Sequence, residues 1–155
     1  MTDNLNQGTA EIAERRAEST RQIQAATGLD VAMLERLVRA FYGAARQDDV
    51  LGPSFDHVSD WDAHIAAITA FWSSAALATG SYSGRPLAAH LPLDLKPRHF
   101  ARWLDLFERA ARDICPAAGA ELLIEKAQRI AKSLEIGAAA HRGELPGGAG
   151  RDQFR

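Results

Sequence analysis

Two histidines, His64 and His90, are the side chains of this sequence best placed for chemistry. His64 lies on an apolar stripe at helical spacing, and His90 follows the apolar turn Leu87-Ala88-Ala89. Neutral imidazole binds transition metals and can also donate or accept a hydrogen bond. Taken alone, either histidine is more often a core or boundary residue than a ligand. The pair, one on a helix and one in the loop that follows it, favours a shared site.

Motifs of other chemistries are absent from the sequence. It contains no H-E-x-x-H zinc motif, no G-x-S-x-G nucleophile motif, and no G-x-G-x-x-G or Walker loop. Cys115 is the single cysteine, so we expect neither an intrachain disulfide nor a cysteine-based zinc site. A net charge of -2 and a pI near 6.2 argue against nucleic-acid binding. The chemistry is therefore sought in the histidines and the aromatic rings.

Four helices are predicted to position these residues. Alanine accounts for 30 of the 155 residues while Val, Ile and Thr are sparse, which favours an all-α fold. Asp30 is a predicted N-cap, and Ser59-x-x-Asp62 is a predicted capping box. Pro97 suits a first helical turn, and Pro116 ends that helix and opens the next. Apolar residues recur every three or four positions in segments 30–47, 60–79, 97–115 and 117–137.

The segment 80–96 is a long loop with at most one short helical turn, at about 87–90. Such a loop is uncommon in a compact domain unless it has a function. If it folds back on the second helix, His64 and His90 face each other across an apolar slot. A haem requires this arrangement, because its iron takes an axial ligand on one face and a polar group on the other. Core packing of the aromatic rings is the alternative. The expected walls are Phe41, Phe55, Ile68, Phe71, Trp72, Trp103 and Phe107.

Four groups of residues between about 41 and 107 form a family pattern. They are Phe41-Tyr42 with Arg46-x-Asp48-x-x-Leu51-Gly52-Pro53-x-Phe55; Trp61-x-x-His64 with Phe71-Trp72; Tyr82-x-Gly84-x-Pro86-Leu87-x-x-His90-Leu91; and Phe100-x-x-Trp103-Leu104-x-Leu106-Phe107. In this order, and with this spacing between the two histidines, the chain resembles the group III truncated haemoglobins of bacteria. The paired-glycine motifs of groups I and II are not found.

The resemblance implies a truncated globin fold, a two-over-two helical sandwich that holds haem b (iron protoporphyrin IX). It implies that His90 is the metal ligand and that Phe55 packs on the haem face. The implied distal residues are Tyr42, His64 and Trp103, of which the phenol and the indole are hydrogen-bond donors suited to an apolar pocket. Other expected cofactor-binding residues are Phe71, Trp72, Phe107, Arg85 and Arg98. Lys96, His99 and Tyr82 are further candidates near the propionates, and the sequence does not choose among them.

The function implied is reversible binding of O₂ and of other diatomic ligands, CO and NO. A haem enzyme with peroxidase-like or nitric oxide dioxygenase activity, served by an unknown reductase, is the alternative. A helical interaction module without haem is a third possibility, which an absorption spectrum distinguishes.

The two ends are predicted to lie outside the truncated globin domain, 29–140. Residues 1–28 are polar and charged and are interpreted as an N-terminal extension that is partly helical at best. Residues 141–155 contain GGAG and little to bury, so we expect a disordered tail. No apolar run approaches 18 residues and the N-terminus lacks an apolar signal region. We therefore expect no membrane span and a cytoplasmic location.

Overall fold

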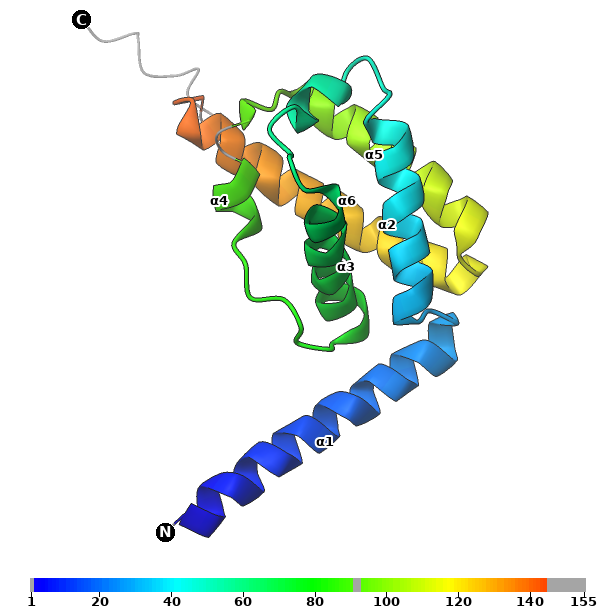
Figure 1. The fold of residues 1–155 in the computed structure, drawn as a ribbon, viewed down its shortest axis with the longest axis vertical. Coiled ribbons are helices and arrows are strands. Elements are labelled where there is room, and N and C mark those ends of the chain that lie inside the picture. The colour runs from blue at the N-terminus through cyan, green and yellow to red at the C-terminus, as the bar shows by residue number, and fades with distance from the viewer. Residues whose placement is uncertain (1, 91–92, 145–155) are drawn as a thin grey trace, which may run out of the picture.

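The computed structural model describes residues 2–90 and 93–144 of the chain and is helical, with no strand in that part. The expected disordered tail lies outside the described residues from 145 onward, as do Leu91 and Pro92. No helix in the described ranges is both long and apolar enough to cross a lipid bilayer. The elements shown in Figure 1 are α1 (Thr2–Thr27), α2 (Val31–Ala45), the 3-10 turn η1 (Gly52–Phe55), α3 (Trp61–Leu77), α4 (Pro86–His90), α5 (Pro97–Ile114) and α6 (Ala117–His141).

The helix starts follow local chemistry, with one difference from the sequence prediction. Asp30 caps α2 as expected, because its carboxylate accepts a hydrogen bond from the Met33 amide at 2.7 Å. Pro97 begins α5. The cap of α3 is Asp60 rather than Ser59. Asp60 has the extended backbone of an N-cap, and its carboxylate accepts from the amide three residues later.

Two helix pairs form the body of the molecule, as the resemblance implies. α2 packs on α3 and α5 packs on α6, while α2 also contacts α5 and α3 contacts α6 (Figure 1). Each helix therefore buries one apolar stripe against two neighbours. The short α4 lies against α6. The most deeply buried core side chains are Leu29, Leu34, Leu37, Val38, Leu77 and Leu123.

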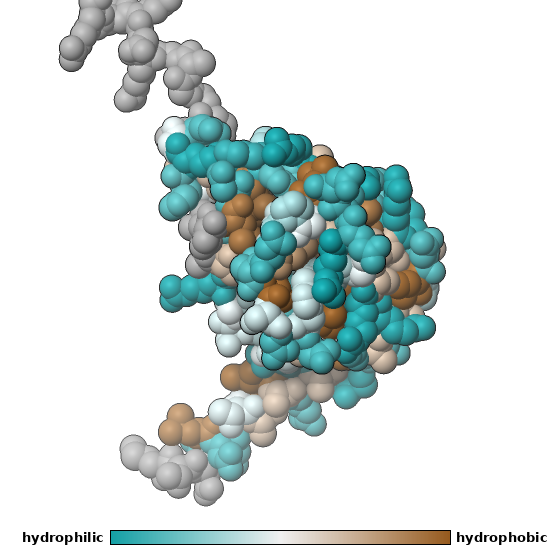
Figure 2. Space-filling model, turned by 45° about the horizontal axis from the view of Figure 1, so that its top comes forward, coloured by the Kyte–Doolittle hydropathy of each residue, from teal (hydrophilic) through white to brown (hydrophobic). Residues whose placement is uncertain are grey.

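The segment expected to be partly helical at best is one continuous helix, α1, and its second half packs on the domain. The Thr20 hydroxyl donates to the Leu77 carbonyl at the end of α3, at 2.6 Å. Ile23 packs against the main core, and Leu29, just after α1, is 1% exposed. Tertiary packing stabilises the second half of α1, and the first half extends from this docked turn because adding residues to a formed helix costs less than starting one. The first half of α1 projects from a mainly hydrophilic surface (Figures 1 and 2).

We expect the two halves of α1 to contribute differently to stability. Deleting residues 2–14 should leave the unfolding free energy nearly unchanged, because this stretch projects from the body. Deleting 2–27 should lower it by roughly 2 kcal/mol or more, because the Thr20 hydrogen bond and the Ile23 contacts are lost. Urea titrations of both truncations measure the difference. Equal stability of the two truncations would contradict this assignment of the contacts.

Candidate functional site

An apolar cavity of about 290 Å³ lies between the two helix pairs and is bounded on one side by α4. It is lined by His64 of α3 and by His90 of α4, so the loop does bring the two imidazoles to one site. This size is close to the lower end of small-molecule pockets, roughly 300–1,000 Å³. All seven walls expected from the sequence line it: Phe41, Phe55, Ile68, Phe71, Trp72, Trp103 and Phe107.

Stacked rings make one wall of the cavity rigid. Phe107 of α5 stacks on Trp72 of α3, with ring centroids 4.8 Å apart, and on Trp103 at 5.3 Å. Phe41 of α2 meets Trp103 edge to face at 5.7 Å. Each such aromatic pair adds about 0.5–1.5 kcal/mol beyond burial of its area. The indole of Trp103 is therefore held in place at the cavity wall by rings from two helices.

A hydrogen bond within α4 orients the His90 imidazole. Its Nδ1 lies 2.5 Å from the Pro86 carbonyl oxygen, one turn earlier in α4. A carbonyl oxygen only accepts hydrogen bonds, so Nδ1 must carry the proton. The lone pair is then on Nε2, which is the tautomer that metal-binding histidines adopt when the other nitrogen is hydrogen-bonded.

Tyr42 and His64 supply polar atoms in the cavity wall. The two rings meet edge to face, with centroids 5.1 Å apart, and Tyr42 is 8% exposed. Burial raises the pKa of Tyr42, so its hydroxyl keeps its proton and can donate. Burial, and then the nearby His57 and His90, lower the pKa of His64, which favours its neutral form.

One buried nitrogen in this region has no partner. Among the described residues, His64 Nε2 is buried and makes no hydrogen bond. Leaving a buried polar group without a partner costs about 1–3 kcal/mol, and such groups are rare in native proteins. A ligand in the cavity that bonds His64 Nε2 would remove this cost.

The cationic candidates differ in their position. Arg85 and Arg98 are exposed and are not among the cavity-lining residues, whereas His99 is. The Lys96 amide donates to His99 Nδ1 at 2.8 Å, so the Nε2 of a neutral His99 carries the proton and can donate. Lys96 itself forms an ion pair with Asp94. The orientation of His99 depends on this local hydrogen bond, which residue types alone did not indicate.

Sequence reasoning missed one side of the lining. The turn before α5 and the last part of α6 contribute apolar side chains near α4. The apolar spacing in segment 117–137 was the available signal for Ile130 and Leu134. Tyr82, from the long loop, also lines the cavity and meets Phe71 edge to face at 5.3 Å. The lining residues on this side are Leu93 and Leu95 before α5, Phe100 at its start, and Ile130, Ala131 and Leu134 in α6.

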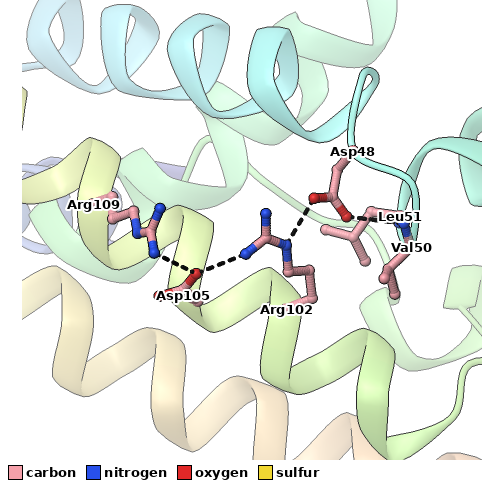
Figure 3. Close-up of polar contacts among 6 residues, drawn as sticks. All are labelled: Asp48, Val50, Leu51, Arg102, Asp105 and Arg109. Carbon is pink, nitrogen blue, oxygen red and sulfur yellow. Dashed lines mark hydrogen bonds and ion pairs between the residues drawn. The ribbon is translucent and has the colours of Figure 1, made fainter.

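A charged network fastens the corner after α2 to α5 (Figure 3). Asp48, whose side chain is 8% exposed, accepts from Arg102 Nε at 2.7 Å. Its other oxygen accepts from the amides of Val50 and Leu51, both at 3.1 Å. Arg102 also pairs with Asp105, which pairs in turn with Arg109 (Figure 3).

The network affects the site through its position in the chain. The corner leads into η1, which carries Phe55, and Arg102 precedes Trp103 on α5. Burial alone would raise the pKa of Asp48, but the hydrogen bonds from Arg102, Leu51 and Val50 outweigh burial and lower it. The ionised carboxylate therefore fixes the corner that leads to Phe55 relative to α5, which carries Trp103.

Comparison with known proteins gives one structural relative. The chain is similar to the crystal structure of a group III truncated haemoglobin from Campylobacter jejuni, with 33% sequence identity and a TM-score of 0.64. The match covers 69% of this chain and 89% of that chain. No protein-family model and no curated protein sequence matches the chain.

We expect Asp48→Asn to destabilise the protein in a pH-dependent way. Because the pKa of Asp48 is lower in the folded state, its stabilising effect is present above the unfolded value, about 3.9, and is lost as the pH falls through the folded value. The variant should therefore melt below the wild type near pH 7 and converge with it in acid. Asp49→Asn, at an exposed neighbour, is the control. A melting difference that does not change with pH would argue against the carboxylate's charge as the cause.

Proposed function

Because the chain belongs to the group III truncated haemoglobins, we propose that it binds haem b in the cavity between its two helix pairs and reversibly binds O₂, CO and NO there. The observation that carries this proposal is the pair of imidazoles in one apolar cavity. His90 is prepared as a ligand, and His64 has a buried, unpartnered nitrogen. The haem, when bound, supplies an iron with an open coordination position for a diatomic ligand.

The side chains around the cavity divide into a proximal ligand and an apolar enclosure. We assign His90 Nε2 as the protein ligand of the iron, since the Pro86 carbonyl holds the proton on Nδ1. Phe55, Phe71, Trp72 and Phe107 would pack against a haem bound in the cavity and exclude water from it. These rings line the cavity, and their stacking keeps it in shape before a cofactor enters.

The distal side chains hold a diatomic ligand by hydrogen bonding. The Tyr42 hydroxyl remains protonated because the residue is buried, and the Trp103 indole N–H can only donate. Both donors would retard the release of a diatomic ligand that carries partial negative charge. His64 is neutral at physiological pH and can accept or donate, which makes it suited to a role at the entrance.

Charged and polar groups at the loop end hold the two propionates. His99 lines the cavity and presents its Nε2 as a donor, so we add it to Arg85 and Arg98 as a propionate partner. The two arginines are exposed, and their long side chains reach a rim more readily than an interior.

A haem enzyme with peroxidase-like or nitric oxide dioxygenase activity is the second candidate. The set of Tyr42, His64 and Trp103 favours it over simple transport, because several donors retain a ligand long enough for a second reactant to meet it. Such an enzyme requires an external reductase. Mixing oxygenated protein with NO, and ferric protein with peroxide, in a stopped-flow instrument separates this candidate from a ligand-binding protein.

The first test is the absorption spectrum of the purified protein together with His90→Gly. Wild-type protein should show a Soret band that shifts on reduction and on CO binding. His90→Gly should retain haem poorly, or give a spectrum that added imidazole restores, because the free base replaces the missing ligand. A normal Soret band and CO complex in the variant without imidazole would refute the role of His90.

The second test measures ligand kinetics in the distal variants. A hydrogen bond to a charged group is worth roughly 1.5–3 kcal/mol, so Trp103→Phe and Tyr42→Phe should each raise O₂ dissociation by about ten- to a hundredfold if the bond acts on the bound state. His64→Leu should mainly change the association rate. Unchanged dissociation rates in both Trp103→Phe and Tyr42→Phe would remove these residues from the distal site.

A further inference from the structure

Trp61, the first residue of α3, contacts the distal side chains without lining the cavity. Its ring centroid lies 5.5 Å from that of His64, and the two rings meet edge to face. It also lies 5.7 Å from Tyr42 and 5.8 Å from Phe55. Tyr42, Phe55 and His64 do line the cavity, so the indole forms a second layer outside them.

Arg46 covers this second layer from the solvent side. It follows the last residue of α2, and its guanidinium carbon lies 4.0 Å from the Trp61 ring centroid. That distance is well within the range of a cation–π interaction. The residue is exposed, so the order from cavity to solvent is His64, then Trp61, then Arg46.

The contact also joins the ends of two helices. Arg46 directly follows α2 and Trp61 begins α3, so their contact links the end of one helix to the start of the next. His64 is one helical turn after Trp61, where side chains share a face. The Trp61 indole therefore lies between the His64 imidazole and the Arg46 guanidinium.

We propose that Arg46 and Trp61 act as a latch that keeps His64 inside the cavity and so limits the entry of small ligands. Both are positioning residues, because they act through His64. The effect on ligand entry rests on the proposed function, whereas the effect on the position of His64 does not. Arg46 and Trp61 are thereby given a role distinct from that of the donors Tyr42 and Trp103.

The test compares Arg46→Gln, Arg46→Lys, Trp61→Leu and the double variant Arg46→Gln/Trp61→Leu. Arg39→Gln is the matched control, since Arg39 is an exposed arginine of the same helix that pairs with Glu35. The first readout is the NMR resonance of the His64 Cε1–H in haem-free and CO-saturated protein labelled with ¹³C-histidine. Ring currents from Tyr42 and Trp61 displace this resonance while the imidazole lies between them.

In Arg46→Gln, which keeps both rings, the resonance should move toward that of the exposed His141, while Arg46→Lys and Arg39→Gln stay near wild type. The second readout is the CO association rate, which should rise about two- to fivefold in Arg46→Gln, equivalent to about 0.5–1 kcal/mol. In the Trp61→Leu background, Arg46→Gln should have no further effect, because the guanidinium then has no ring to hold.

Four results would overturn the latch. An unmoved His64 resonance in Arg46→Gln shows that the contact does not control the position of the imidazole. An equal shift of the His99 resonance means general loosening of the domain. An undiminished effect of Arg46→Gln in the Trp61→Leu background means that Arg46 acts by another route. A moved His64 resonance with an unchanged CO association rate means that the position of His64 does not limit ligand entry. A wild-type protein without a Soret band would refute the proposed function, and the haem-free NMR measurement would still decide the position of His64.

Discussion

A protein that keeps an apolar cavity open must satisfy or immobilise the polar atoms that face it. Here Tyr42, His64 and His90 all line one cavity, and their protonation states follow from this placement. Burial keeps the phenol protonated and favours the neutral form of the His64 imidazole, while a carbonyl oxygen sets the tautomer of His90. The unpartnered Nε2 of His64 is the residual cost of this arrangement. A cofactor and its ligand that bonded this nitrogen would remove the cost, and this is the physical reason for the proposed function.

The surroundings of the cavity hold these groups by three different means. Stacked rings from α3 and α5 hold the Trp103 side of the wall. The Asp48–Arg102 pair fastens the corner that carries Phe55 to the helix that carries Trp103 (Figure 3). The cation–π contact of Arg46 with Trp61 covers His64 from outside. Trp72, Phe107 and the Asp48 carboxylate are buried, the Arg102 side chain is 37% exposed, and the Arg46 contact lies at the surface, where cation–π contacts are weak.

α1 adds stability at a distance from the site. The Thr20 hydroxyl donates to the carbonyl of Leu77, the last residue of α3, the helix that carries His64, and Ile23 packs on the core. These contacts stabilise the second half of α1, from which the first half extends as a continuous helix. They also give α3 a defined C-terminal end, while Asp60 defines its beginning.

The amino-acid sequence predicts the all-α class, four helix positions, the placement of His64 and His90 at one cavity, and its seven apolar walls. These follow from periodicity, capping chemistry and residue type, which act over a few neighbouring positions. Three features emerge only from the packed molecule: His99, rather than Arg85 or Arg98, lines the cavity, α1 docks on the domain, and Arg46 covers Trp61. Each depends on how a side chain points from a loop or a helix end, or on contact between segments far apart in the chain. Spacing along the sequence does not specify such directions, because packing against distant residues selects them.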